Sequence, residues 1–499
     1  MKKVISLILI ILILVTSVSI VGCTGDKDET NSTTTAETNS TETILDDGYE
    51  DNLPDDINLD MIIKMAARGQ DRFYDEFTVE KENAVDLVSS AVYARNLEVE
   101  ERLGIELIID LVDKETHGTI RNSLETSIAA GDNTYDIVTH SMFYSMGFAA
   151  KGYFYDLNEL EYIDTTKDYW SQLYIEQATV SDHLYTITGE ATLSALRGAF
   201  AIFVNTNVAE KYDISVNELY DNVNNKQWTM EMMNNLSENV YENLDGSEKP
   251  TVNDVYGYIT NDSTCIDQFW SSFDIDILGH DSEGNYELVV DNEKLYSAYS
   301  DIYDLIYTNP GTYCYSYVSA NSELTDMTIA FAENRALFMN NWLRIMEYQE
   351  MRQISGEYTV LPCPMYDENQ ETYYSYVHDG LTVFSIPFGV EEDRLQDLGM
   401  FLEAYASESR NTVIPAYYED TLQVKFSSGE NMALMLDYIR QGWNVNAGWM
   451  MNNTINKIPQ LIRTQIQSGS KEIASVYTSN SYPIPLLLNS WENNFNYHD

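Results

Sequence analysis

The chain has 499 residues, of which 44 % are hydrophobic and 12 % aromatic, so it is not a wholly disordered protein. At about 150 residues per domain, this length is enough for two or three sizeable hydrophobic cores. There are 28 Lys and Arg against 80 Asp and Glu, and the resulting net charge of −52 excludes nucleic acid and makes anionic lipid headgroups poor partners.

The N-terminus has the composition of an export signal. Two lysines after Met1 are followed by an apolar stretch over residues 4–21, and Gly22 directly precedes Cys23. This pattern resembles a bacterial lipoprotein signal, in which residues 1–22 are removed and Cys23 is acylated. Two acyl chains hold a protein stably on a membrane, so we expect it on the outer face of the membrane, in a single-membrane bacterium. An uncleaved helical anchor is the alternative.

Residues 23–58 are expected to form an acidic tether after the lipidated cysteine. They are rich in Thr, Asn, Ser, Asp and Glu and have almost no apolar side chains, so they cannot offset the entropy of ordering. The remaining cysteines, Cys265, Cys314 and Cys363, are far apart in sequence. This spacing argues against a disulfide framework and a zinc site, and leaves open one disulfide or three thiols.

Helical and strand patterns alternate from residue 59 onward. Residues 86–102 place Val88, Val92 and Val99 on one helical face, and Gly104 is a suitable helix end. Residues 105–112 form a β-rich apolar run. The sequence therefore predicts a helix followed directly by a strand.

The same alternation continues over the next segment. The patterns predict a helix over residues 120–130, a strand over 135–139, and a second helix from Phe143 to Gly152. Strands and helices at this spacing indicate parallel α/β layers. Ligands of open α/β sheets bind at the carboxyl ends of strands, so we expect functional residues just after Thr139.

No catalytic signature is found along the chain. Phosphate-binding, dinucleotide-binding, zinc-protease and serine-hydrolase motifs are absent, and the six histidines have no metal-ligand spacing. Residues 281–287 resemble a calcium loop only faintly and are better explained as a hairpin turn. We therefore expect a protein that is not an enzyme and holds neither cofactor nor metal.

Eight segments, in order along residues 60–499, carry a family resemblance. They are RNLEVEERLGI at 95–105, DIVTHS at 136–141, AAKGYFYDL at 149–157, FVNTNVAEKY at 203–212, QWTMEM at 227–232, AFAENRALF at 330–338, NW at 341–342 and YTVLPCP at 358–364. These segments resemble the extracellular solute-binding proteins of ABC sugar importers, the family that includes maltose-binding protein. Asn334 stands where the family usually has Gly, which is compatible with a left-handed backbone.

The resemblance implies an α/β fold of the type II periplasmic-binding-protein kind, with two lobes, hinge strands and a cleft between the lobes. Lobe 1 is expected to comprise residues 59–189 and 379–414, and lobe 2 residues 190–378 and 415–499. The chain would cross between them near 188–190, 378–379 and 414–418. A monomer would capture a carbohydrate in the cleft, close on it and deliver it to ABC permease subunits in the membrane.

A sugar presents apolar faces and a rim of hydroxyls, so its site needs aromatic rings and planar polar groups. By the positions of the motifs, we expect binding residues after the 135–139 strand, at two family aromatic positions, at the first two crossings, and in QGWNVNAGW at 441–449. Trp228 is expected in the core, beside a helix cap. The predicted ligand-binding residues are His140, Tyr144, Glu190, Phe269, Trp270, Trp342, Asp379, Trp443 and Trp449.

Three alternatives stay open at this point. The same fold could bind a peptide, polyamine or other non-sugar solute, for which the negative charge is suitable. A surface-tethered carbohydrate-active enzyme would need two carboxylates at catalytic separation in the cleft. A structural surface lipoprotein would bind no small ligand.

Overall fold

The structure is a computed structural model that describes residues 51–69, 74–112, 119–131, 134–316, 322–423 and 429–495. The predicted signal peptide, Cys23 and most of the predicted tether lie outside these residues. The folded part begins earlier than residue 59. Leu53 is buried, and both guanidinium nitrogens of Arg102 lie 2.7 Å from the Asp51 carboxylate. Residues 51–58 therefore pack on the fold, because an apolar and an ionic contact hold a segment that is polar in composition.

The first sheet has the strand order β13-β3-β1-β2. Strands β1 (Met61–Arg68), β2 (Ile105–Val112) and β3 (Ile137–Ser141) are parallel, and β13 (Thr382–Ser385) joins β3 in the antiparallel direction. The predicted parallel α/β arrangement is confirmed. The helices in these parts of the chain are α2 (Leu87–Leu103), α3 (Thr119–Ala130), α4 (Met142–Ala149), α5 (Gln172–Ala178), α14 (Glu392–Asn411) and α15 (Val413–Gln423). We call this sheet with its helices the first lobe.

Helix α2 shows how local signals produce this part of the fold. The Asp86 side chain caps its N-terminus in a capping box with Ser89, and Gly104 ends it with φ 64°. Val92, Val99 and Leu103 are buried against the lobe. The predicted helix over 86–102 and the following strand are confirmed.

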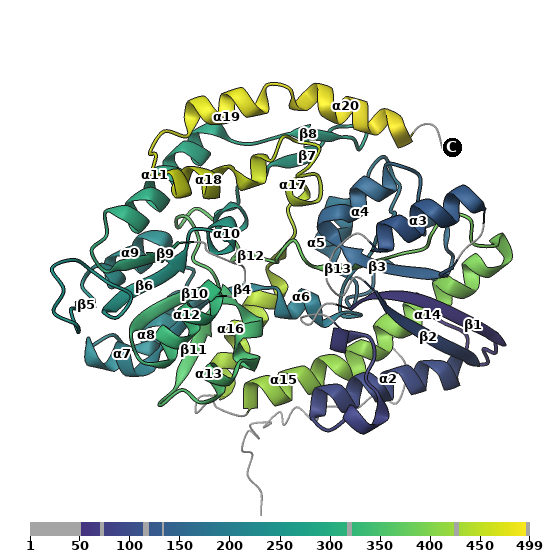
Figure 1. Ribbon diagram of the computed structural model, residues 1–499, viewed down its shortest axis with the longest axis horizontal. Helices are drawn as coiled ribbons and strands as arrows, with labels where there is room; N and C mark the ends of the chain where they lie inside the picture. The colour runs from purple at the N-terminus through teal and green to yellow at the C-terminus, as the bar shows by residue number, and fades with distance from the viewer. Residues whose placement is uncertain are drawn as a thin grey trace, which may run out of the picture. The chain divides into compact units, whose positions relative to one another are not determined.

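The second sheet has the order β11-β4-β10-β6-β5, with β9 also paired to β6. Strand β4 (Phe200–Asn205) runs antiparallel to both its neighbours, β10 (Ala336–Trp342) and β11 (Tyr358–Leu361). The other strands are β5 (Tyr241–Glu242), β6 (Val255–Asn261) and β9 (Thr312–Tyr315). This sheet and the helices of this part of the chain form the second lobe (Figure 1). These helices are α7 (Thr206–Lys211), α8 (Val216–Asn224), α9 (Met230–Glu238), α10 (Thr264–Ser272), α11 (Asn292–Tyr307), α12 (Ser322–Ala332), α13 (Gln349–Arg352) and α16 (Gly429–Gln441).

A β-hairpin and the last helices of the chain pack beside the second lobe. A hairpin of β7 (Leu278–His280) and β8 (Tyr286–Leu288) confirms the predicted turn, and Tyr286 contacts Trp491 at 5.8 Å between ring centroids. The remaining helices are α17 (Ala447–Met450), α18 (Leu461–Ser468), α19 (Ala474–Ser481) and α20 (Ile484–Phe495), and the 3-10 helices are η1 (Tyr74–Glu76), η2 (Lys81–Asn83), η3 (Leu157–Glu159), η4 (Leu343–Glu347) and η5 (Ile458–Gln460).

Two neighbouring segments link the lobes. The first contains helix α6 (Leu193–Arg197), and the second runs beside it, with bridges between Ile187 and Phe384 and between Ala199 and Val377. Strand β12 (Ser375–Tyr376) pairs with β14 (Trp443–Asn444) in the same region. The third crossing lies later than the predicted 414–418. Helix α15 still packs against α2, and only α16 packs against β11 of the second sheet.

Local expectations for two polar or aromatic residues are met. Trp228 is fully buried, and the side chain of Thr229 caps helix α9. Asn334 has φ 59°, so a left-handed residue stands at the position where we expected one.

The cysteines of the described ranges, Cys265, Cys314 and Cys363, are free thiols. No helix in the described part of the chain is long and apolar enough to cross a membrane.

Candidate functional site

Residues 378–380 lie on the second linking segment, where the carboxyl ends of strands β1, β3 and β10 meet. Strand β1 ends at Arg68, whose guanidinium donates to the carbonyl oxygen of Gly380 and, at 3.2 Å, to the hydroxyl of Thr382. Strand β3 ends at Ser141, whose hydroxyl donates to the carbonyl oxygen of Asp379 at 2.8 Å. The carboxyl end of a strand is where α/β sheets present ligand-binding groups, so this segment is a candidate site.

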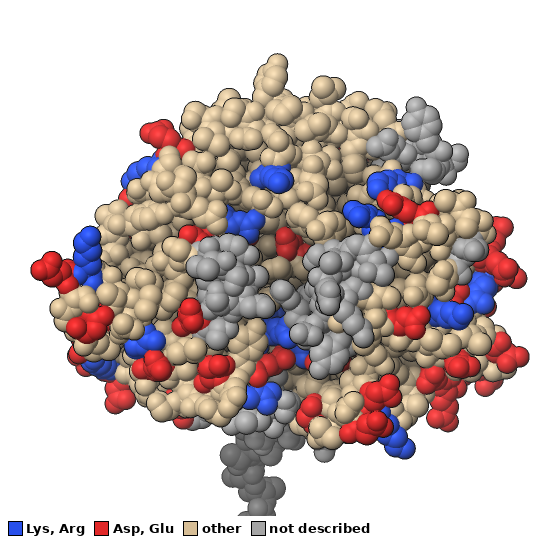
Figure 2. Space-filling model, in the orientation of Figure 1, with Lys and Arg blue, Asp and Glu red and all other residues tan. Residues whose placement is uncertain are grey.

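The second lobe reaches the same segment through Trp342, the last residue of β10. Its ring centroid lies 5.3 Å from that of His378. Side chains of both lobes therefore converge on residues 378–380. Figure 2 shows a hollow at the centre of one face, with acidic and basic side chains around it, whereas acidic side chains predominate on the lower part of that face.

Asp379 is the carboxylate of this segment. Its Oδ1 lies 3.1 Å from Nδ1 of His378, and its side chain is 27 % exposed. Burial raises the pKa of Asp379, but the charges of His378, Arg463 and Arg68 outweigh burial, so the net result is a lowered pKa. The group is therefore an ionised acceptor at neutral pH, and part of its surface is open to a ligand.

A buried ion pair stands beside Asp379. Arg463 of α18 lies 3.0 Å from Oδ2 of Asp267, and its guanidinium is 6.0 Å from the ring centroid of Trp449. Oδ1 of Asp267 has no hydrogen-bond partner among the described residues. Burial and the charge of Asp379 raise the pKa of Asp267, whereas Arg463 lowers it. Trp449 in turn contacts Tyr376 at 5.6 Å.

The structure places five of the predicted residues around this segment. His140 and Tyr144 lie at the end of β3 and the start of α4, with ring centroids 5.6 Å apart, and the neighbouring Phe143 amide donates to the Asp379 carbonyl at 3.3 Å. His140 is buried and Tyr144 half-buried. The other three residues are Trp342, Asp379 and Trp449.

Phe269 and Trp270 lie elsewhere, which corrects the prediction for both. They are fully buried in α10, where every residue from Cys265 to Ser272 is buried. Phe269 packs on Phe273 at 5.1 Å, and the Trp270 indole donates to the carbonyl oxygen of Pro459 at 2.8 Å. Trp270 holds α10 against η5, and both rings form core rather than a ligand platform.

Glu190 and Trp443 line a cavity of about 420 Å³ that does not include residues 378–380, together with Trp170, Arg410 and Arg440. The Glu190 carboxylate forms an ion pair with Arg440 and lies 3.7 Å from Arg410. We predicted that Glu190, at the first crossing, accepts hydroxyl protons from a ligand; in the structure its carboxylate is held by these two arginines.

Three residues of the candidate site were missed in the sequence: Arg68, Asp267 and Arg463. Asp267 lies in α10, three residues before Trp270, and no motif in the sequence singled it out. Arg68 and Arg463 belong to no motif that we could identify.

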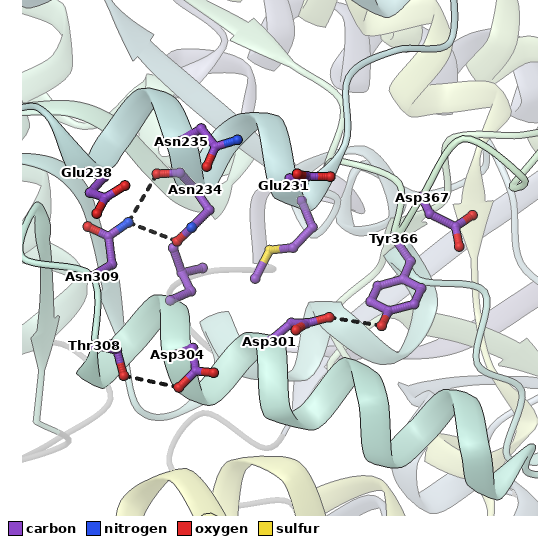
Figure 3. Close-up of a pocket in the computed structure, with 12 residues that line it drawn as sticks. Glu231, Asn234, Asn235, Glu238, Asp301, Asp304, Thr308, Asn309, Tyr366 and Asp367 are labelled. Atoms are coloured by element: carbon purple, nitrogen blue, oxygen red, sulfur yellow. Dashed lines mark hydrogen bonds between the residues drawn. The ribbon is translucent and has the colours of Figure 1, made fainter.

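A second cavity, of about 540 Å³, lies on the second lobe between α9 and α11 (Figure 3). Its carboxylates include Glu231, Glu238 and Asp301, and Asp301 accepts a hydrogen bond from Tyr366 at 2.9 Å. None of the predicted binding residues lines it. Within the described residues, no group of three or more His, Cys, Asp or Glu could hold a metal ion.

Comparison with known proteins places this geometry in context. No family model and no curated protein matches the chain. An ABC transporter solute-binding protein from Thermotoga lettingae, bound with alpha-D-tagatose, has a TM-score of 0.55 at 14 % identity, over 86 % of this chain and 100 % of the other. The fold is that of the two-lobe solute-binding proteins. The fold prediction is confirmed.

Two further solved structures agree with this assignment. An ABC substrate-binding protein from Listeria monocytogenes, in complex with cycloalternan, gives a TM-score of 0.52 at 11 % identity, over 86 % of this chain and 99 % of that chain. The apo form of RafE from Streptococcus pneumoniae gives 0.51 at 15 % identity, over 88 % and 98 %. The Thermotoga lettingae and Listeria monocytogenes structures are described as solute-binding and substrate-binding proteins of ABC transporters, the kind that the sequence motifs resemble.

Proposed function

We propose that this protein captures a carbohydrate in a cleft between its lobes and delivers it to the permease of an ABC importer. The observation that carries the proposal is the pairing of Trp342 with the His378–Asp379 segment. An indole ring offers an apolar face for sugar C–H groups, and an ionised carboxylate accepts hydroxyl protons. Trp342 belongs to the second lobe, and Ser141 and Arg68 of the first lobe hold the segment that carries Asp379, so a ligand that contacts both groups favours the closed arrangement.

The charges at the site favour a neutral ligand. Among the described residues, the ionised Asp379 lies near the guanidinium groups of Arg463 and Arg68, and Arg463 also pairs with Asp267, whose pKa burial raises well above its usual range. The site therefore carries no excess of negative charge, although the chain has a net charge of −52. A polyamine would gain little from a site whose carboxylates already have cationic partners, whereas a sugar uses both charged groups as hydrogen-bonding partners.

We further propose that acyl chains on Cys23 hold the mature protein on the outer face of the cell membrane. The segment between Cys23 and the packed residues near Asp51 would then act as the tether. Cys23→Ser should move the exported protein from the membrane fraction to the medium and abolish its labelling by radioactive palmitate. A variant that stays membrane-bound would contradict lipid anchoring through this cysteine.

Thermal unfolding of the purified protein tests the proposed ligand class. The panel contains mono- and oligosaccharides such as tagatose, maltotriose and cycloalternan, with amino acids, peptides and spermidine alongside. A ligand at 100 times its dissociation constant adds about 2.7 kcal/mol to the free energy of unfolding. We expect stabilisation by one class of carbohydrate without formation of any hydrolysis product. Stabilisation by spermidine or peptides alone would overturn the carbohydrate proposal, and product formation would overturn the proposal of a binding protein.

A further inference from the structure

Two buried ions of opposite charge lie on the first linking segment. Glu190 precedes helix α6 and Arg197 ends it, and the two side chains are only 4 % and 6 % exposed. Burying a charge costs free energy unless oppositely charged partners surround it. The partners of these two residues therefore show what the linking segment connects.

Arg197 is held by one carboxylate from each lobe. Its Nη1 and Nη2 each lie 2.9 Å from an oxygen of Asp75, which belongs to η1 of the first lobe. Its Nε lies 2.7 Å from Oε1 of Glu347, at the end of η4, which follows β10 of the second lobe. The Tyr417 ring completes the surroundings at 5.6 Å. Arg197 thus joins the two lobes through a bidentate and a single contact.

Glu190 repeats this arrangement with the charges reversed. Arg440, near the end of α16, comes from the second lobe, where α16 packs on β11. Arg410, near the end of α14, comes from the first lobe, where α14 packs on α2, and its Nη1 lies 3.7 Å from Glu190 Oε2. Each central ion therefore has one oppositely charged partner on either lobe.

Both ion clusters border cavities rather than tightly packed apolar surfaces. A cavity of about 170 Å³ beside Arg197 is lined by Asp75 and Ser89 of the first lobe and by Glu347 of the second. The cavity of about 420 Å³ beside Glu190 is likewise lined by residues of both lobes. Space beside the ions allows the lobes to move, and any such motion changes the distances within the clusters.

We propose that the Asp75–Arg197–Glu347 and Arg410–Glu190–Arg440 clusters form an electrostatic clamp that holds the lobe arrangement seen in this structure. When the lobes move, each central ion loses its partner on one lobe and keeps its partner on the other. The ion is then never left buried without a partner, so movement costs less than breaking an isolated buried pair. The clamp needs no ligand, and its test is therefore independent of the proposed carbohydrate.

Distances between spin labels measure the effect of the clamp. Labels on Glu101→Cys in α2 and Asn217→Cys in α8 report the separation of the lobes, in a background with Cys23 and Cys314 replaced by serine. Arg197→Gln should shift or broaden the distance distribution relative to the unsubstituted background. Asp75→Asn and Glu347→Gln each remove one end of the clamp and should change the distribution in the same direction.

Arg102→Gln is the matched control, because Arg102 also forms a bidentate pair, with Asp51, but both residues lie within the first lobe. We expect its distance distribution to match the background. If Arg197→Gln does not fold, Asp75→Asn and Glu347→Gln decide the question, because both carboxylates are partly exposed. Distributions identical to the background in these folded variants would overturn the clamp.

Discussion

The indole ring of Trp342 lies 5.3 Å from the imidazole ring of His378, with an angle of 43° between the ring planes. This contact joins the last residue of β10, in the second lobe, to the segment that carries Asp379 between the lobes. Ser141 of the first lobe holds the same segment through the Asp379 carbonyl oxygen. A ligand at this point would touch groups held by both lobes.

Trp342→Phe should weaken binding of the stabilising carbohydrate about fivefold, which corresponds to about 1 kcal/mol, because the smaller ring covers less of a sugar face. Isothermal titration measures the change. Trp228→Phe is the control. Trp228 is also buried, but its indole donates to the carbonyl oxygen of Pro362 within the second lobe. That variant should lower the melting temperature and leave the affinity unchanged. Equal affinities for Trp342→Phe and the wild type would remove the indole from the site.

Asp379→Asn should lower the affinity about tenfold or more, because a hydrogen bond to a charged acceptor contributes about 1.5–3 kcal/mol. The pKa of Asp379 is lowered in the folded protein. Its ionised form is therefore kept from pH 8 to pH 5, and its contribution to stability is lost only as the pH falls through the folded-state pKa. We expect a flat affinity profile over pH 5–8. A decline in affinity centred near pH 6 would show that a histidine, and not Asp379, controls binding.

Glu403 makes the stability of the first lobe depend on pH. Burial raises its pKa to about 7, although Tyr169 and Trp170 donate hydrogen bonds to it. The folded protein therefore binds a proton that the unfolded chain releases at lower pH, and stability falls as the pH rises from about 4.5 to about 7. The effect is at most about 4 kcal/mol, at about 1.4 kcal/mol per pKa unit.

Glu403→Gln removes this titration, so its melting temperature should fall less than that of the wild type between pH 5 and pH 8. Calorimetry at four or five pH values measures the difference. Parallel profiles for the two proteins would show that Glu403 does not titrate in this range.

Asn334→Gly tests why asparagine stands at a position of left-handed backbone. Glycine suits φ 59° at least as well. The Asn334 side chain, however, accepts hydrogen bonds from Asn205 at 3.0 Å and Asn207 at 3.1 Å. We expect a loss of about 1–2 kcal/mol in the free energy of unfolding, measured by urea denaturation. A more stable glycine variant would mean that backbone conformation alone governs this position.

Local patterns were sufficient to predict much of the fold. The apolar stripe of α2 and the glycine at 104 depend on neighbours within a few residues, and so does the turn between β7 and β8. Trp228 was predicted correctly because a helix cap follows it directly. The start of the folded part was set too late because composition does not reveal that Asp51 meets Arg102, at a distance along the chain.

The candidate site was harder to predict, for the same reason. An aromatic pair such as Phe269 and Trp270 has the same sequence signal in a core as in a cleft, and only the packing of α10 on η5 decides between them. Glu190 pairs with Arg410 and Arg440, more than two hundred residues later, and no local pattern predicts these partners. Asp267 and Arg463 meet only in the folded chain.

The most direct test of the account is isothermal titration of the purified protein with the carbohydrate that raises its melting temperature most, in the wild type and in Asp379→Asn. Carbohydrate capture at residues 378–380 predicts saturable binding with one molecule per chain, weakened at least tenfold by the substitution. Equal binding by both proteins would place the ligand elsewhere, and no heat of binding with any neutral carbohydrate would contradict carbohydrate capture itself.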